Sequence, residues 1–206
     1  MIARSARRIL KPAEIGDAYN RIAGWWEAEL QASTRGLAYV ERAIGLCTAR
    51  QKALDVGCGT GGRILSALEK AGFELTGLDV SQEMLRIARD HHPTVAFMWA
   101  DVCTWEPAGP FDLITAWDSL IHVPLALQGS VLEKLCHALN PHGVILITVG
   151  GSKGELTSRM QGLSFYHSSL DDHHYLEVIK AAGCRCLLLE CDQFPEEHMV
   201  LIAVKE

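Results

Sequence analysis

A carboxylate and a series of glycines with fixed spacing are the residues of this chain best placed to do chemistry. The apolar run Ala53-Leu54-Asp55-Val56 contains one carboxylate, and Gly57, Gly59 and Gly61 follow it at alternate positions. Glycine permits positive φ angles and lets a ligand approach the main chain closely. A helix that begins near Gly62 points free N–H groups and its positive dipole end at this turn. The sequence therefore predicts a buried strand, a tight turn and a helix that together bind a carboxylate or phosphate.

Two ligand-binding patterns fit this turn. Gly57, Gly59 and Gly62 satisfy the dinucleotide pattern G-x-G-x-x-G. Asp55, Gly57, Gly59 and Gly61 satisfy acidic-x-G-x-G-x-G, which resembles motif I of the class I S-adenosylmethionine-dependent methyltransferases. An ordinary tight loop is a third interpretation. Residues outside this turn are needed to distinguish between the three interpretations.

Two more carboxylates follow predicted strands. Asp79 ends the strand that begins at Phe73, and Asp101 follows the strand predicted over 94–99. The carboxyl ends of parallel strands form one crevice at one edge of a sheet, so we expect Asp55, Asp79 and Asp101 to lie at a common site. An acidic residue at the position of Asp79 is suited to the two hydroxyl groups of a ribose. This coincidence carries more weight than any single motif.

Composition narrows the possible partners. The chain has 206 residues, of which 49% are apolar, and a formal net charge of −6, which argues against binding to phosphate backbones. Seven cysteines without a C-x-x-C pair fit free thiols in a reducing compartment. The basic opening of the chain lacks the features of a secretion signal, and no stretch is apolar enough to span a membrane. We therefore expect a cytoplasmic protein with a small-molecule partner, without nucleic acid or membrane.

The order of predicted elements indicates an α/β fold. Strands and helices alternate up to the strand over 144–149, which predicts a parallel sheet. About eight residues separate the last two apolar runs, too few for a crossover helix, so they should form an antiparallel hairpin. We also expect two helices within 12–48, broken near 32–34, with Ser33 or Thr34 capping the second. A further helix should run from about Ala126 to Leu139. A long loop over 150–168 should cover the site, and a helix capped near Ser168-Ser169 should follow it.

The resemblance to the class I methyltransferases spans nearly the whole chain. It implies a Rossmann-like three-layer sandwich with a seven-stranded, mostly parallel sheet in the order 3-2-1-4-5-7-6. Residues 1–206 would form a single domain, with residues 1–48 as an N-terminal helical lid and residues 49–206 as the core. Part of that lid, from Tyr19 to Glu27, resembles the Y-D-x-x-A-x-x-Y-D segment of small-molecule methyltransferases, although an amphipathic helix that packs Tyr19, Ile22 and Trp26 explains the same residues.

The resemblance also implies a set of residues for S-adenosyl-L-methionine, whose product is S-adenosyl-L-homocysteine. Asp79 would bind the ribose, and Asp101 and Val102 the adenine. The methionine portion would contact Asp55 and the main chain of Gly57, Cys58, Gly59, Thr60 and Gly61, the adenine ring would pack on Val80 and Met84, the sulfonium would lie beside Trp117 and Asp118, and Tyr19 and Trp26 would close the site from above.

The acceptor side of the site is less well determined by the sequence. If the methyl acceptor has to lose a proton, His122 is the first candidate for a base, with packing or capping as the alternative. Tyr166 and His167 are second candidates for the base and for contact with the acceptor, and His198 is a third candidate for the base. His173 and His174 beside two aspartates resemble a metal cluster, but consecutive residues at a helix start do not converge on one ion, so no metal is expected.

These observations predict an S-adenosylmethionine-dependent methyltransferase with a small-molecule acceptor of unknown identity. An NAD-dependent oxidoreductase remains open because of the second glycine pattern. A noncatalytic S-adenosylmethionine-binding subunit or sensor also remains open, because a fold does not imply an activity. The atom that is methylated and the oligomeric state are not determined.

Overall fold

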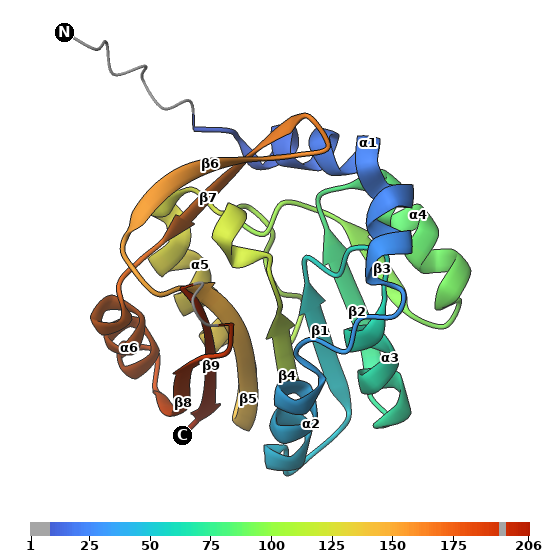
Figure 1. Cartoon of the computed structure of the whole chain (residues 1–206). Helices are drawn as coiled ribbons and strands as arrows, with labels where there is room; N and C mark the ends of the chain where they lie inside the picture. The colour runs from blue at the N-terminus through green and yellow to red at the C-terminus, as the bar shows by residue number, and fades with distance from the viewer. Residues whose placement is uncertain (1–8, 194–196) are drawn as a thin grey trace, which may run out of the picture.

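A computed structural model describes residues 9–193 and 197–206 of the chain. Most of the basic opening segment and Pro195 lie outside these residues. The described chain folds around one sheet of seven strands in the order β3-β2-β1-β4-β5-β9-β8 (Figure 1). Its strands are β1 (Lys52–Val56), β2 (Glu74–Asp79), β3 (Ala96–Trp99), β4 (Phe111–Ala116), β5 (Leu139–Gly150), β8 (Cys184–Cys191) and β9 (His198–Lys205).

The pairing of these strands confirms the predicted sheet. β1 pairs in parallel with β2 and β4, β2 with β3, and β4 with β5. β9 is antiparallel to both β5 and β8. The order therefore corresponds to 3-2-1-4-5-7-6 when the strands of this sheet are counted alone. The carboxyl ends of β1, β2, β3 and β4 consequently lie along the same edge.

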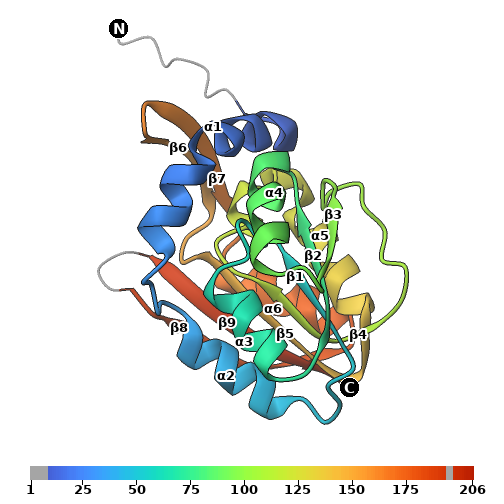
Figure 2. The same ribbon diagram turned by 90° about the vertical axis from the view of Figure 1, so that its right-hand side faces the viewer.

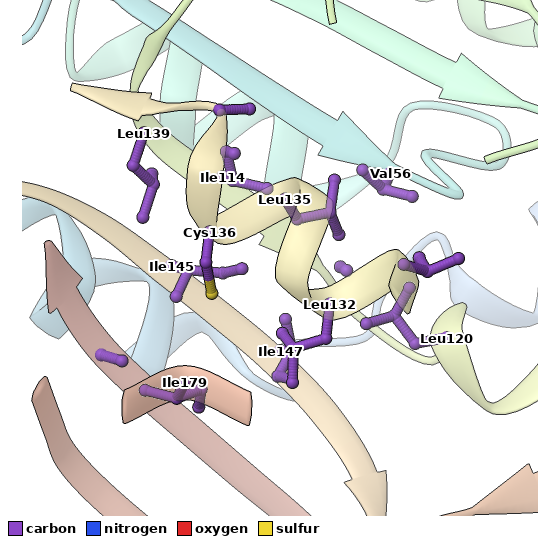
Figure 3. Packing of buried hydrophobic residues seen from close by; sticks show 14 of the residues in the cluster. Val56, Ile114, Leu120, Leu132, Leu135, Cys136, Leu139, Ile145, Ile147 and Ile179 are labelled. Carbon is purple, nitrogen blue, oxygen red and sulfur yellow. The ribbon is translucent and has the colours of Figure 1, made fainter. Parts of the chain in front are cut away.

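Helices cover both faces of the sheet, which makes three layers. α2 (Leu37–Leu46), α3 (Arg63–Lys70) and α4 (Gln82–His91) lie on one face, in front of the sheet in Figure 2, and their apolar side chains form one core cluster with inward residues of the strands. α5 (Leu125–His137) and α6 (Asp172–Ala181) cover the other face. Figure 3 shows how Leu132, Leu135 and Cys136 of α5 lie against the sheet residues Ile145 and Ile147.

A two-stranded sheet stands where we expected a long loop. β6 (Gly154–Met160) and β7 (Leu163–Ser169) pair as an antiparallel hairpin, so the prediction of a loop over 150–168 was wrong in its conformation. The hairpin lies with α1 (Pro12–Leu30) at the end of the sheet toward which β1 and β4 point (Figure 1). Ile15 and Ile22 of α1 pack there on Phe165 and Tyr166 of β7 in a separate apolar cluster. Packing on α1 thus stabilises the hairpin, since an isolated two-stranded hairpin is only marginally stable in water.

Several predicted helix boundaries differ from those observed. α2 begins after Gly36, which takes a left-handed conformation with φ of 80°, so neither Ser33 nor Thr34 is its cap. Asp171, and not Ser168 or Ser169, caps α6 by accepting the N–H of His174 at 3.0 Å. α5 ends at His137, and Leu139 already belongs to β5. Ser81 caps α4, because its Oγ accepts the N–H of Met84 at 3.2 Å.

Helix α1 is fixed to the start of α4. Oδ1 of Asn20 accepts hydrogen bonds from the Ser81 hydroxyl at 2.8 Å and from the N–H of Glu83 at 3.0 Å. Gly16 lets the helix approach closely, since a Cβ atom there would lie 2.6 Å from the carbonyl oxygen of Val80. These contacts hold α1 across the carboxyl end of the sheet, above the predicted site.

The glycine turn after β1 packs directly on the segment after β4. Gly57 has φ of 70°, and a Cβ atom at this position would overlap Cβ of Ser119. The Ser119 hydroxyl donates to the carbonyl of Val56 at 2.7 Å, and the N–H of Gly57 donates to the carbonyl of Leu78 at 2.7 Å. The turn is therefore fixed to both neighbouring strands.

We predict that Gly57→Ala destabilises the fold by about 3 kcal/mol, because alanine is strained at a positive φ and its Cβ atom would overlap Ser119. Gly72→Ala is the matched control, because Gly72 also has a positive φ of 89° but a Cβ atom added there would meet nothing within 4 Å, so about 1 kcal/mol is expected. Urea unfolding measures both. Ser119→Gly should recover the packing part of the loss in the double variant, and equal losses for Gly57→Ala and Gly72→Ala would contradict the contact.

Candidate functional site

A cavity of about 490 Å³ lies between the carboxyl ends of the strands, the glycine turn and α1. This volume lies within the range of small-molecule sites. All fifteen residues predicted for the cofactor line it: Tyr19, Trp26, Asp55, Gly57, Cys58, Gly59, Thr60, Gly61, Asp79, Val80, Met84, Asp101, Val102, Trp117 and Asp118. Their individual roles stay predictions, but the structure brings them together.

The glycine turn presents its main chain to this cavity. Gly57, Gly59 and Gly61 all have positive φ angles. A Cβ atom on Gly59 would meet only Nε1 of Trp26, at 4.0 Å, so it would project into open space of the cavity. A Cβ atom on Gly61 would instead lie 2.6 Å from the ring of His92. Gly59 thus leaves room for a ligand against the backbone, whereas Gly57 and Gly61 permit close packing.

Two buried carboxylates stand behind the turn. Oδ1 of Asp55 accepts the Thr115 hydroxyl at 2.7 Å, and burial raises the pKa of Asp55 to about 7, with a further contribution from nearby Asp79. Asp79 accepts the N–H of Gly59 at 2.8 Å and that of Ser81 at 2.8 Å. Burial raises the pKa of Asp79 as well, although these main-chain bonds oppose the shift. Val80 also donates its N–H to this carboxylate, so three of the about four lone-pair sites of Asp79 are used and one remains for a further donor.

The end of the cavity away from the glycine turn lies beyond β3. Oδ1 of Asp101 accepts the N–H of Cys103 at 2.8 Å in a tight turn, and Val102 is half-buried beside it. Val80 and the fully buried Met84 line the cavity between this turn and the glycine turn. This end therefore offers a carboxylate, main-chain groups and an apolar wall.

Tyr19 and His122 form a hydrogen-bonded pair on the acceptor side. The Tyr19 hydroxyl lies 2.9 Å from Nε2 of His122, and Nδ1 of His122 lies 2.8 Å from the carbonyl oxygen of Tyr166. Because a carbonyl only accepts, Nδ1 carries the proton and Nε2 accepts from the phenol. Burial lowers the pKa of His122 to about 4 and raises that of Tyr19. Both groups are therefore neutral at pH 7, and Nε2 already has a partner.

Tyr166 and His167 are placed differently from His122. Neither is among the described residues that line the cavity. The Tyr166 side chain is buried, donates to Glu155 at 2.6 Å and accepts the N–H of Leu125 at 3.1 Å. His167 lies 2.7 Å from the Ser158 hydroxyl. Their predicted contact with the acceptor stays a prediction, whereas the Tyr166 carbonyl does position His122.

From the sequence we did not predict that Asp118, His198 and Asp192 form one hydrogen-bonded group. Nε2 of His198 lies 2.7 Å from Oδ1 of Asp118, and its Nδ1 contacts Oδ1 of Asp192. Burial by itself lowers the pKa of His198, but the two carboxylates outweigh it and raise the pKa to about 9. His198 entered the sequence analysis only as a third candidate for a base. No local spacing signals this group, because 80 positions separate His198 from Asp118.

Trp117 forms the wall beside Asp118. Its ring is buried, and the ring centroid lies 5.7 Å from that of His198. The ring also packs against Gly36, since a Cβ atom added to Gly36 would lie 2.6 Å from it. Its Nε1 has no hydrogen-bond partner within the described part of the chain. Arg63, at the start of α3, also lines the cavity. Aromatic and carboxylate groups thus lie together where β1 and β4 end.

Metal-ligating residues do not gather in the ranges 9–193 and 197–206, where no group of three or more His, Cys, Asp or Glu side chains is arranged to hold an ion. Within the same ranges, no helix combines the length and apolar character needed to cross a membrane.

Comparison with known proteins identifies the family. Residues 53–143, from β1 to the start of β5, match the family described as "Methyltransferase domain". This chain belongs to the class I S-adenosylmethionine-dependent methyltransferases. The match includes the glycine turn, Asp79 at the end of β2 and Asp101 after β3. It confirms the predicted family and fold class.

Curated members of the family match part of this chain. Trans-aconitate 2-methyltransferase of Delftia acidovorans is 37% identical over 131 residues, which are 62% of this chain and 48% of that protein. Ubiquinone biosynthesis O-methyltransferase of Vibrio parahaemolyticus is 32% identical over 150 residues, or 66% of this chain and 62% of that protein. The chain thus spans about half the length of the first of these relatives.

Solved structures share the fold over almost the whole chain. The DhpI–SAH complex aligns with a TM-score of 0.73 at 22% identity, over 97% of this chain and 98% of that one. Magnesium protoporphyrin IX methyltransferase of Synechocystis with bound SAM aligns with a TM-score of 0.72 at 15% identity, over 98% and 100%. At these identities the likeness establishes the fold.

We predict that His122 remains neutral, with its proton on Nδ1, throughout pH 5 to 8. Its pKa of about 4 and its two neutral partners favour this form. Imidazole ¹⁵N chemical shifts, assigned by loss of the signal in His122→Gln, measure both the tautomer and the titration. Protonation with a midpoint near 6.5 would contradict the buried, doubly bonded arrangement.

Proposed function

We propose that this chain catalyses methyl transfer from S-adenosylmethionine to a small-molecule acceptor. The observation that carries the proposal is that the fifteen residues expected around this cofactor line one cavity in a chain of this family. The residues present fit the group, because the cavity offers bare backbone at Gly59, a buried carboxylate acceptor at Asp79 and a second carboxylate at Asp101. The named relatives and the bound SAM and SAH of the fold neighbours support it further.

Each part of the cavity has a proposed ligand group. Asp79 accepts hydrogen bonds from the ribose hydroxyls, and Asp101 with the N–H of Val102 binds adenine between Val80 and Met84. The methionine portion lies along the glycine turn, where Asp55 accepts from its ammonium group. The start of α3 favours its carboxylate, because free N–H groups and the positive dipole end point there.

The bound cofactor would supply a methyl group already activated on a sulfonium. The main task of the chain is therefore to align an acceptor with this methyl group and to exclude water. Tyr19 and Trp26 of α1 cover the cavity, and their rings lie 5.5 Å apart in an edge-to-face arrangement. His122 supports Tyr19 through its hydrogen bond. Its action as a base stays a prediction, because a pKa of about 4 makes it a weak one.

Further parts of the proposal concern the surroundings of the reaction. We propose that residues 1–206 act as one methyltransferase domain with residues 1–48 as its lid. We also propose that the protein works in the cytoplasm, without nucleic acid or membrane partners. The net charge of −6 and the free cysteines support this placement.

Asp79→Asn tests the ribose contact. We expect S-adenosylmethionine to bind at least tenfold more weakly to this variant, because one charged hydrogen-bond acceptor is lost while the side-chain volume is kept. Asp90→Asn is the matched control, since Asp90 lies on the exposed face of α4. Titration calorimetry with S-adenosylmethionine, S-adenosylhomocysteine and NAD measures the affinities, and circular dichroism checks the fold.

Three results would change the proposal. Preference of the wild-type protein for NAD would favour the oxidoreductase. Binding of S-adenosylmethionine without turnover on a broad panel of acceptors would favour a noncatalytic sensor. An unchanged affinity in Asp79→Asn would remove Asp79 from the ribose site.

The raised pKa of Asp55 gives a pH-dependent test. Below pH 7 the carboxyl is mostly protonated and accepts the cofactor ammonium poorly, so affinity for S-adenosylmethionine should rise as the pH increases from 6 to 8. Asp55→Asn should bind more weakly and lose this dependence. A wild-type affinity that is constant over this range would contradict the assignment of Asp55 to the ammonium group.

A further inference from the structure

Asp118 reaches the cavity from an unusual backbone conformation. Its φ is 52°, in the left-handed region where aspartate and asparagine are tolerated best among residues other than glycine. Its N–H donates to Oγ1 of Thr148 on β5 at 2.7 Å, and the following Ser119 is fixed to the glycine turn through Val56. The residue is therefore held between β1 and β5, beside the place proposed for the methionine portion.

Within residues 9–193 and 197–206, hydrogen bonds reach one of the two carboxylate oxygens of Asp118. Oδ1 accepts both Nε2 of His198, at 2.7 Å, and the hydroxyl of Thr148, at 3.2 Å. No hydrogen bond to Oδ2 occurs among the described residues. The Asp118 side chain lines the cavity and is 41% exposed, whereas His198 is 17% exposed and Asp192 7%. Oδ2 is thus the oxygen that the chain offers to a ligand.

His198 is charged because of its two partners. Ionised carboxylates only accept hydrogen bonds, so a ring with a carboxylate oxygen at each nitrogen carries both protons. Among the described residues, the Gln193 amide and Trp117 also contact the ring, and both are uncharged. The histidine bonds and nearby Arg63 hold the pKa of Asp118 below its usual range, although burial opposes them. Asp118 therefore remains a carboxylate across the neutral range.

We propose that Asp118 binds the N–H or O–H group of the methyl acceptor through Oδ2, and that His198 and Asp192 are positioning residues for it. This inference rests on the proposed methyl transfer and goes beyond it, because it names the acceptor class as an amine or a hydroxyl compound. A carboxylate beside the transferred methyl group orients such a nucleophile by its hydrogen bond. The carboxylate also attracts a positively charged group placed where the methyl group would lie.

The test uses two cofactor analogues that differ at this point. Sinefungin carries an ammonium group where S-adenosylmethionine carries the sulfonium methyl, and S-adenosylhomocysteine carries neither. We expect the wild-type protein to bind sinefungin about tenfold more tightly than S-adenosylhomocysteine, and Asp118→Asn to bind both equally. Asparagine keeps the shape of the side chain and tolerates the left-handed backbone. His198→Gln should retain only part of the preference.

Asp101→Asn is the control, since it lies at the other end of the cavity and should weaken both ligands alike. If all ligands bind but Asp118→Asn keeps the wild-type preference, the inference is wrong while the proposed function stands. If neither analogue nor S-adenosylmethionine binds the wild-type protein, the proposed function fails and takes the inference with it.

A second measurement tests the positioning group in the ligand-free protein. We expect imidazole NMR signals of His198 to show a charged ring up to pH 8, and Asp118→Asn or Asp192→Asn each to lower its pKa. A wild-type midpoint near 6.5 would show that the two carboxylates do not hold the ring, and would overturn the roles of His198 and Asp192.

Discussion

The contact between Gly57 and Ser119 is the constraint on which the site depends. It brings the turn after β1 against the turn after β4, with no room for a side chain between them. This contact sets the positions of the protein groups near the proposed reacting atoms. The main chain of Gly59 faces the cavity on one side of the contact, and Asp118 faces it on the other. A larger separation of the two turns would move a carboxylate away from the ligand and admit water.

Much of the fold could be predicted because its signals are local. The apolar runs that became β1, β4 and β5 are largely buried, so their composition identifies them without periodicity. The carboxylates at 55, 79 and 101 end successive parallel strands, and topology alone brings them to one edge. The terminal hairpin was recognisable from the short distance between β8 and β9. These inferences required no knowledge of contacts between distant residues.

The predictions that failed depend on contacts between distant parts of the chain. β6 is mostly exposed, so its sequence has no clear apolar alternation, and its partner strand is stabilised by α1 from the other end of the sequence. The start of α2 was misplaced because Gly36 is required by the ring of Trp117, which packs against it. The same limitation applies to His198, since its two carboxylates come from different loops. Pairings of this kind are properties of the folded chain.

The cluster shared by α1 and β7 has a consequence for how ligands enter. It is separate from the two clusters that stabilise the sheet and contains few buried side chains. Lifting α1 from the cavity would break this small cluster, the Asn20 bonds and the Tyr19–His122 bond, but no strand pairing of the seven-stranded sheet. Regions with few buried apolar contacts open at a lower free energy than the global fold. The entrance and the scaffold thus have different stabilities, so amide exchange in α1 and β7 would be faster than in β4 or β5.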